Sequence, residues 1–293
     1  MRALTRAELL KLRTTRILGW TLAGTLVMVL VTTIASVPST GSTNPVVPLD
    51  DPALLARTVG VSYLWPQLTV ALLGVLSYTQ EERHGTITWT YLVEPRRRRV
   101  LVAKGGALAL VSTVVAVATL AVSLVASCAL IRARHGNVTL GAELWQVVAA
   151  AALVLAATGL IGIGIGTLVR NQIIAVTLTL VWLTAGEHLL IEVLPQVARW
   201  TPGGATNGLL QLGDVATTSG TVLHAPIGGL LLMGYTGAAF GLALVIAPRR
   251  DVLGRHALPW SRPMGARGGP TGTRASRSAS VCPRAGRVGS ALR

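Results

Sequence analysis

The chain has few charged residues for its length. Only 13% of its 293 residues are Asp, Glu, Lys or Arg, whereas 51% are hydrophobic, and the mean hydropathy is +0.60. Soluble domains carry about 25% charged residues, so the composition excludes a soluble protein and indicates an integral membrane protein. The short alternating segments of outer-membrane barrel strands are also missing. We therefore predict an all-α, polytopic membrane protein.

Cysteine is scarce as well. Cys128 lies within an apolar run and Cys282 lies near the C-terminus. Two cysteines in such different environments, without the spacing of metal ligands, support neither a disulfide framework nor a zinc site. We expect no metal bound by this chain.

Nucleotide-binding motifs are missing too. The sequence contains no G-x-x-x-x-G-K-[ST] phosphate loop. Gly162, Gly164 and Gly166 form a G-x-G-x-G run, but it lies inside a long apolar segment and its third glycine is misplaced for dinucleotide binding. Gly162 and Gly166 instead have the spacing that lets two membrane helices approach closely. We expect no cofactor and no enzymatic activity in this chain.

Six apolar runs are long enough to cross a bilayer, which takes about 20 helical residues. We place the spans at residues 17–37, 59–78, 105–131, 144–169, 173–191 and 227–247. Pro66 predicts a kink or local unwinding in the second span. Glu187 and His188 interrupt the far end of the fifth span.

Two segments flank a six-span permease domain that we place at residues 17–258. Residues 1–16 alternate leucines with charged residues, which predicts an amphipathic helix lying at the membrane interface. The apolar run after it is longer than the core of a secretory signal, so we expect an uncleaved span. Residues 259–293 are rich in Arg, Gly, Ser and Pro, which predicts a disordered basic tail.

The distribution of Lys and Arg predicts the orientation. With the N-terminus inside, 22 of the 26 Lys and Arg residues lie in the cytoplasm, and the other four are Arg57, Arg132, Arg134 and Arg199. Cationic residues near span ends are retained in the cytoplasm, so both termini are predicted to lie there. The net charge of +15 then reflects orientation and attraction to anionic lipid. No folded basic module indicates a nucleic-acid partner.

A polar, cation-rich segment, residues 81–104, joins the second and third spans. Such a segment does not lie in lipid, so we expect it to project into the cytoplasm. The cations near its end are expected to bind anionic lipid at the membrane surface and to hold this end inside. They are Arg96, Arg97, Arg98, Arg99 and Lys104.

Polar residues within the spans are candidates for a transport path or an outer vestibule: Gln67, Glu187, His188 and Glu192. His188 and Glu192 share a helix face, but no third metal ligand is evident. Counting along the fifth span places Glu187 roughly 22 Å across the membrane, near the outer interface. Two interpretations stay open. One is a solvated vestibule or an inter-helix hydrogen bond, and the other is a part in transport, since ionisable groups in membranes are costly and often functional.

Four elements, in this order, resemble the type-2 ATP-binding-cassette (ABC) exporter permeases. They are the N-terminal run from Leu4 to Arg13, the segment from Glu81 to Thr88 with Pro95 and the basic run after it, the triplet Arg170 to Gln172, and the stretch Arg199 to Gly204. The resemblance covers the chain from Met1 to about Asp251. It implies a permease in the cell membrane that pairs with a separate ATPase subunit, usually with two copies of each.

The resemblance also implies that residues 81–104 contain a short coupling helix that docks in a groove on the ATPase, which binds ATP and Mg²⁺. The residues expected in this contact are Glu81, Glu82, Arg83, His84, Gly85, Thr86, Ile87, Trp89 and Tyr91, with Leu92 adding to a half-apolar surface. Gly85 permits a tight turn, and Trp and Tyr often anchor interfaces. Alternatively, Trp89 and Tyr91 rest at the level of the lipid headgroups.

Two other classes of function stay open. A secondary transporter would need ionisable residues at the bilayer midplane or broken helices in corresponding halves. A membrane scaffold or an intramembrane enzyme would use Glu187, His188 and Glu192 as its best site. The spans do not single out a cargo among drugs, peptides, lipids and polysaccharides, and the export direction comes from the resemblance alone. Whether the second permease copy is identical also stays open.

Overall fold

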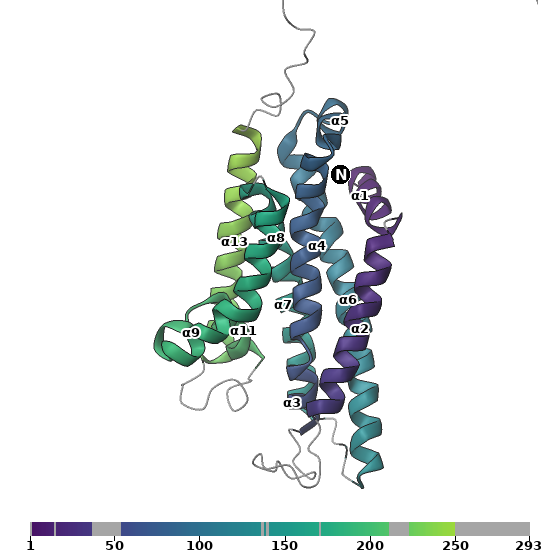
Figure 1. Cartoon of the computed structure of the whole chain (residues 1–293), viewed down its shortest axis with the longest axis vertical. Helices are drawn as coiled ribbons and strands as arrows, with labels where there is room; N and C mark the ends of the chain where they lie inside the picture. Colours follow the sequence, from purple (N-terminus) through teal and green to yellow (C-terminus); the bar gives the residue numbers. More distant parts are fainter. Residues whose placement is uncertain are drawn as a thin grey trace, which may run out of the picture. The chain divides into compact units, whose positions relative to one another are not determined.

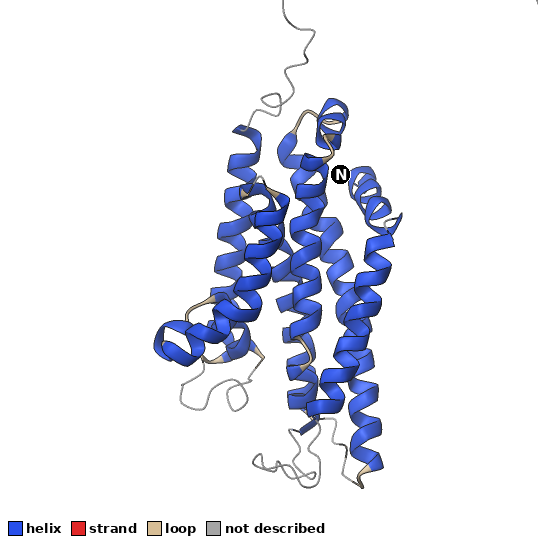
Figure 2. Cartoon of the chain, viewed as in Figure 1, coloured by secondary structure: helices blue, strands red, loops and turns tan. Residues whose placement is uncertain are grey.

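The computed structural model describes residues 2–14, 16–36, 54–135, 138, 141–169, 171–210 and 223–249. These residues form helices joined by short connections, and no strand occurs among them (Figure 2). The all-α prediction is therefore confirmed. The predicted basic tail, Arg170 and most of the loop between the first two spans lie outside the described residues.

Among the described residues, six helical segments are long and apolar enough to cross a membrane, which agrees with the predicted number of spans. They are α2 (Arg16–Ser36), α3 with α4 (Leu54–Val61 and Leu64–Arg83), α6 (Arg97–Ala133), α7 (Ala142–Leu168), α8 with η1 and α9 (Gln172–Val181, Trp182–Gly186 and Glu187–Val193), and α13 (Ala225–Arg249). In the described parts of the chain four short helices accompany them: α1 (Arg2–Thr14), α5 (Thr86–Val93), α10 (Pro195–Ala198) and α11 (Pro202–Leu209).

The second span is interrupted near Pro66, as predicted. Helix α3 ends at Val61, Ser62 and Tyr63 form a turn, and α4 begins at Leu64. Pro66 is thus the third residue of α4, where its missing N–H costs no helical hydrogen bond. The break therefore lies just before the proline.

Helices α4 and α7 pack along each other at the centre of the bundle (Figure 1). Glycines make this contact close. A Cβ atom placed on Gly162 would lie 2.5 Å from the carbonyl oxygen of Ala71, and one on Gly166 would lie 2.8 Å from that of Val75. The backbones of the two helices touch, so the predicted packing function of Gly162 and Gly166 is confirmed.

The fifth span changes its winding part of the way along. Between α8 and α9, residues Trp182–Gly186 form a π-helical turn, η1. Such turns are rare, and they occur frequently at functional sites. After α9 the chain folds back through α10 into α11, which packs against α13. The hydroxyl of Tyr235 on α13 donates to the carbonyl oxygen of Trp200 at 2.8 Å and fixes this return.

Candidate functional site

Helix α5 lies between the ends of two spans, at the same end of the bundle as α1 (Figure 1). Helix α4 ends at Arg83, and only His84 and Gly85 separate it from α5. Gly85 has φ +67°, a left-handed conformation that glycine adopts without steric cost. Pro95 lies in the extended link to α6. A short helix therefore occupies the place predicted for the coupling helix, whereas its contact with an ATPase stays a prediction.

One side of α5 packs on its own chain. Ile87 is buried and packs with Tyr78 and Leu101. Tyr91 is half-buried, and the guanidinium of Arg97 lies 5.0 Å from the centre of its ring. The prediction that Ile87 contacts a partner protein is wrong, because its side chain anchors α5 to the bundle.

The other side of α5 is apolar and uncovered. Trp89 is 73% exposed, Leu92 71% and Val93 85%. Their spacing of three and four residues places them on one helix face, which we call the α5 apolar face. Val93 was missed in the sequence, although the same spacing from Trp89 includes it.

Charged residues from three helices meet beside α5. The ammonium of Lys104 on α6 lies 2.8 Å from Glu8 Oε2 on α1 and 2.7 Å from Glu81 Oε1 on α4. The ammonium of Lys11 lies 2.9 Å from Glu8 Oε1 and 3.1 Å from Glu81 Oε1. We call Glu8, Lys11, Glu81 and Lys104 the charge cluster. It ties the last turn of α4 to the first turns of α6 and to α1.

Lys104 is only 3% exposed, so its predicted place among the cations of the membrane surface is wrong. It also donates to the carbonyl oxygen of Ser77 at 3.3 Å. A buried ammonium needs such partners, because an unpaired buried charge is very costly. Glu8 was missed as a site residue. In the sequence, Lys104 stands at the start of an apolar run, which indicates that it needs a carboxylate partner. The sequence does not show which carboxylates pair with it.

The charges of the cluster stabilise one another. Burial raises the pKa of Glu8, but the attraction and hydrogen bonds of Lys104 and Lys11 outweigh it and hold the pKa below its ordinary value. Burial lowers the pKa of Lys11, but Glu8 and Glu81 outweigh it and raise the pKa above its ordinary value. Both shifts favour the charged forms at neutral pH. Helix α1 is thus held by ion pairs, whereas its predicted contact with a membrane stays a prediction.

The remaining residues of segment 81–104 lie around this cluster. Glu82 is half-buried, and Arg83, His84, Gly85 and Thr86 are exposed. Arg83 donates to Gln172 Oε1 at 3.3 Å, which links α4 to α8. Of the basic run, Arg97 donates to the carbonyl oxygen of Pro248 on α13 at 3.3 Å. The three others, Arg96, Arg98 and Arg99, are exposed, and their contact with lipid stays a prediction.

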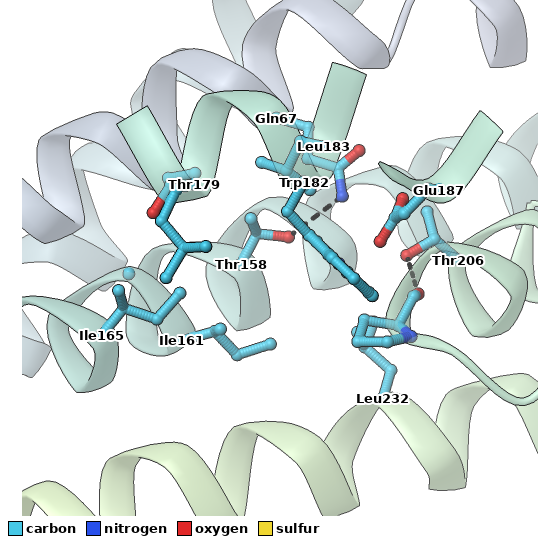
Figure 3. A pocket seen from close by; sticks show the side chains of 14 residues that line it. Gln67, Thr158, Ile161, Ile165, Thr179, Trp182, Leu183, Glu187, Thr206 and Leu232 are labelled. Carbon is cyan, nitrogen blue, oxygen red and sulfur yellow. Dashed lines mark hydrogen bonds between the residues drawn. The ribbon is translucent and has the colours of Figure 1, made fainter. Parts of the chain in front are cut away.

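A cavity of about 300 Å³ lies within the bundle, between α4, α7, the fifth span, α11 and α13 (Figure 3). Its walls are mainly apolar. The polar side chains that line it are Gln67, Thr158, Thr179, Glu187 and Thr206. Gln67 and Glu187, predicted candidates for a transport path, therefore come together here. His188 and Glu192 are exposed and do not line the cavity.

Glu187 is held at the start of α11. The carboxylate lies against Gly203 of α11 and beside Trp182 (Figure 3), while its Oε1 atom has no hydrogen-bond partner among the described residues. The carboxylate lies so close to Gly203 that a Cβ atom there would collide with it. Glu187 is only 8% exposed, which disfavours the solvated vestibule and leaves the inter-helix hydrogen bond and the part in transport as interpretations. Within the described parts of the chain, no three His, Cys, Asp or Glu side chains are grouped to hold a metal.

Residues 4–186 of the chain match the protein-family model described as ABC-2 family transporter protein. The match covers more than half of the chain. It includes the charge cluster, α5 and Gln67, whereas Glu187 lies one residue beyond it. No curated protein matches the chain.

Replacing Lys104 with methionine tests the charge cluster. Glu8 and Glu81 then share only Lys11, and removing one partner of a buried ion pair costs about 3–5 kcal/mol. We expect the free energy of unfolding of the purified protein, measured by denaturant titration in mild detergent, to fall by this amount. Arg99→Met removes an exposed cation of the same helix and should change it by less than about 0.5 kcal/mol. The double variant Glu8→Gln/Lys104→Met should recover part of the loss, and additive losses would contradict the pairing.

The stability of the cluster should depend on pH. The pKa of Glu8 is lowered, so its contribution is complete above the ordinary value of 4.5 and is lost as the pH falls below it. The pKa of Lys11 is raised, so its contribution is complete below 10.5 and is lost as the pH rises beyond it. The unfolding free energies of the native protein and Glu8→Gln should therefore differ between these limits and converge in acid. A difference that persists in strong acid would contradict this assignment.

Proposed function

Because the chain belongs to the ABC-2 transporter family, and is thus the permease of an ABC transporter, we propose that it exports its substrate with ATP hydrolysed by a separate subunit. The missing phosphate loop supports this division of labour. In this proposal the chain is not itself an ATPase, and ATP and Mg²⁺ bind to the partner. The single observation that carries the proposal is the α5 apolar face.

The α5 apolar face has the properties of a docking surface. Trp89, Leu92 and Val93 project from a helix that is anchored on its other side by Ile87. Anchored helices lose little conformational freedom on binding, and exposed tryptophans often dominate the energy of interfaces. Exposed polar residues, among them His84 and Thr86, lie at the start of α5 and suit the rim of such a contact.

The charge cluster supports a mechanism for coupling. ATP binding closes the ATPase subunits and moves each docked α5. Because α5 is bound covalently to α4 and α6, and Glu81 pairs with Lys104 across them, the force on α5 reaches both spans together. The ATPase shifts the permease only insofar as its contact with α5 differs between the two conformations.

The remaining parts of the proposal concern the assembly in the membrane. The permease lies in the cell membrane with both termini in the cytoplasm, as the distribution of Lys and Arg favours. It works with a second permease copy, identical or different. Arg96, Arg98 and Arg99 are exposed and bind anionic lipid headgroups near α5.

The rival functions are less well supported. A membrane scaffold or an intramembrane enzyme would depend on Glu187, His188 and Glu192 at the far end of the fifth span. Only Glu187 of that set lines the cavity, while His188 and Glu192 point elsewhere and are exposed. The set therefore does not assemble into one site in this chain.

Replacing Trp89 with alanine tests the proposed ATPase contact. Truncating a central aromatic anchor costs about 2 kcal/mol or more, so we expect the ATPase that co-purifies from native membranes to fall by about tenfold or more. Co-purified ATPase is measured by mass spectrometry of phosphate-loop proteins and by ATP hydrolysis. Trp145→Ala is the matched control, because Trp145 is 61% exposed but lies at the start of α7, at the other end of the bundle. Equal recovery of ATPase from both variants would contradict the proposal.

A further inference from the structure

Among the described residues that line the cavity, Glu187 is the one with an ionisable carboxylate, and none is Lys, Arg or His. A carboxylate that is 92% removed from solvent needs a cation or further donors to remain charged. Its Oε1 atom has no hydrogen-bond partner. The described wall of the cavity therefore offers Glu187 no cationic partner.

The other polar groups of the wall are largely committed to their own helices. The hydroxyls of Thr158, Thr179 and Thr206 each donate to the carbonyl oxygen four residues earlier, at 2.8–2.9 Å. Threonines bonded in this way have no donor left for a ligand. Gln67 Nε2 is 3.5 Å from Thr158 Oγ1, a long contact that a ligand could replace. Glu187 is thus the strongest polar group that the cavity offers.

Trp182 adds a second feature that suits a cation. Its side chain lies beside Glu187 on the cavity wall (Figure 3), and it belongs to the π-helical turn η1. Trp182 is 41% exposed, and the face of an indole ring attracts cations at exposed as well as buried sites. A carboxylate and an indole ring lie next to each other, and aliphatic side chains line the cavity beyond them. This arrangement is suited to binding an organic cation.

A purely structural explanation accounts for only part of this geometry. The start of α11 carries partial positive charge, which Glu187 can offset through Gly203. However, α11 already has its own cap, because Thr201 Oγ1 accepts from the backbone N–H of Gly204 at 3.3 Å. Capping of α11 also does not account for two observations: the Oε1 atom of Glu187 has no hydrogen-bond partner, and a cavity lies beside it.

We propose that this cavity binds an apolar molecule with one cationic nitrogen, whose cation pairs with Glu187 and contacts the ring of Trp182. The volume of about 300 Å³ lies at the lower end of the range of small-molecule sites, so the bound part is small. The inference rests on the proposed export function, since the bound molecule would be the substrate class. Binding itself requires no ATPase.

Three probes of one shape test the charge preference: 4-phenylbutylamine, 4-phenylbutanol and 4-phenylbutyrate. The full chain in lipid nanodiscs is titrated with tritiated amine in a scintillation-proximity assay, with the alcohol and the acid as competitors. We expect the amine to bind at least about tenfold more tightly than the alcohol, and the acid to bind more weakly than either. Equal affinities for amine and alcohol, tighter binding of the acid, or no binding of the amine would overturn the inference.

Glu187→Gln tests the residue. The amide keeps the shape but removes the charge, so amine affinity should fall by at least about tenfold while alcohol affinity stays the same, because losing one partner of a buried charge pair is expensive. His188→Gln, at an exposed neighbouring position outside the cavity, should change neither affinity. An unchanged amine affinity in Glu187→Gln would overturn the inference. If this variant does not fold, the inference is tested by the relative affinities of the native protein for the three probes.

The proposed function is tested separately. Loss of the amine preference with normal ATPase co-purification overturns only the inference about the cavity. Amine binding by a chain that recovers no ATPase leaves the cavity assignment standing and contradicts the export function.

Discussion

The pairing of Lys104 with Glu8 and Glu81 is the interaction on which the arrangement around α5 depends. Three helices that are far apart in the sequence each supply a charge, and the ammonium is buried among them. Buried ion pairs are costly to form and costlier to break on one side. The cluster therefore fixes the geometry of α1, α4 and α6 more than it adds net stability. Helix α5 is anchored by Ile87 to the helices that the charge cluster holds together.

One helix connects the proposed ATPase contact with the cavity. Helix α4 carries Glu81 in the charge cluster and Gln67 in the cavity wall, and these are 14 positions apart, about 21 Å along a helix. The glycines of α7 hold α4 closely between Val70 and Val75. Across the cavity, the π-helical turn at Trp182 interrupts the fifth span. The cavity therefore has the closely packed pair of α4 and α7 on one side and an irregular turn on the other.

The spans could be predicted from the sequence because apolar runs of about 20 residues have few alternative structures. The polar character of residues 81–104 predicts a segment outside the membrane, whereas the short helix within it was implied by the resemblance to ABC exporter permeases. The errors concern side-chain surroundings. The sequence places Lys104 and Ile87 on surfaces and leaves a solvated Glu187 open, because the burial of each side chain depends on which other helices pack against it. Residues that pair across 70 or more positions, as Lys11 and Glu81 do, leave no local pattern.

The central claim is that the charge cluster holds α1 and the start of α6 as one rigid base during the ATPase cycle. Spin labels at Leu10 on α1 and Arg98 on α6, both exposed, test it most directly by electron–electron distance measurements in the assembled transporter. Cys128 and Cys282 are first replaced by serine. The account predicts that the distance between the two labels of one permease copy is narrowly distributed and the same without nucleotide and with nucleotide trapped. In Lys104→Met this distribution should broaden. A distance that shifts with nucleotide in the native background would contradict it.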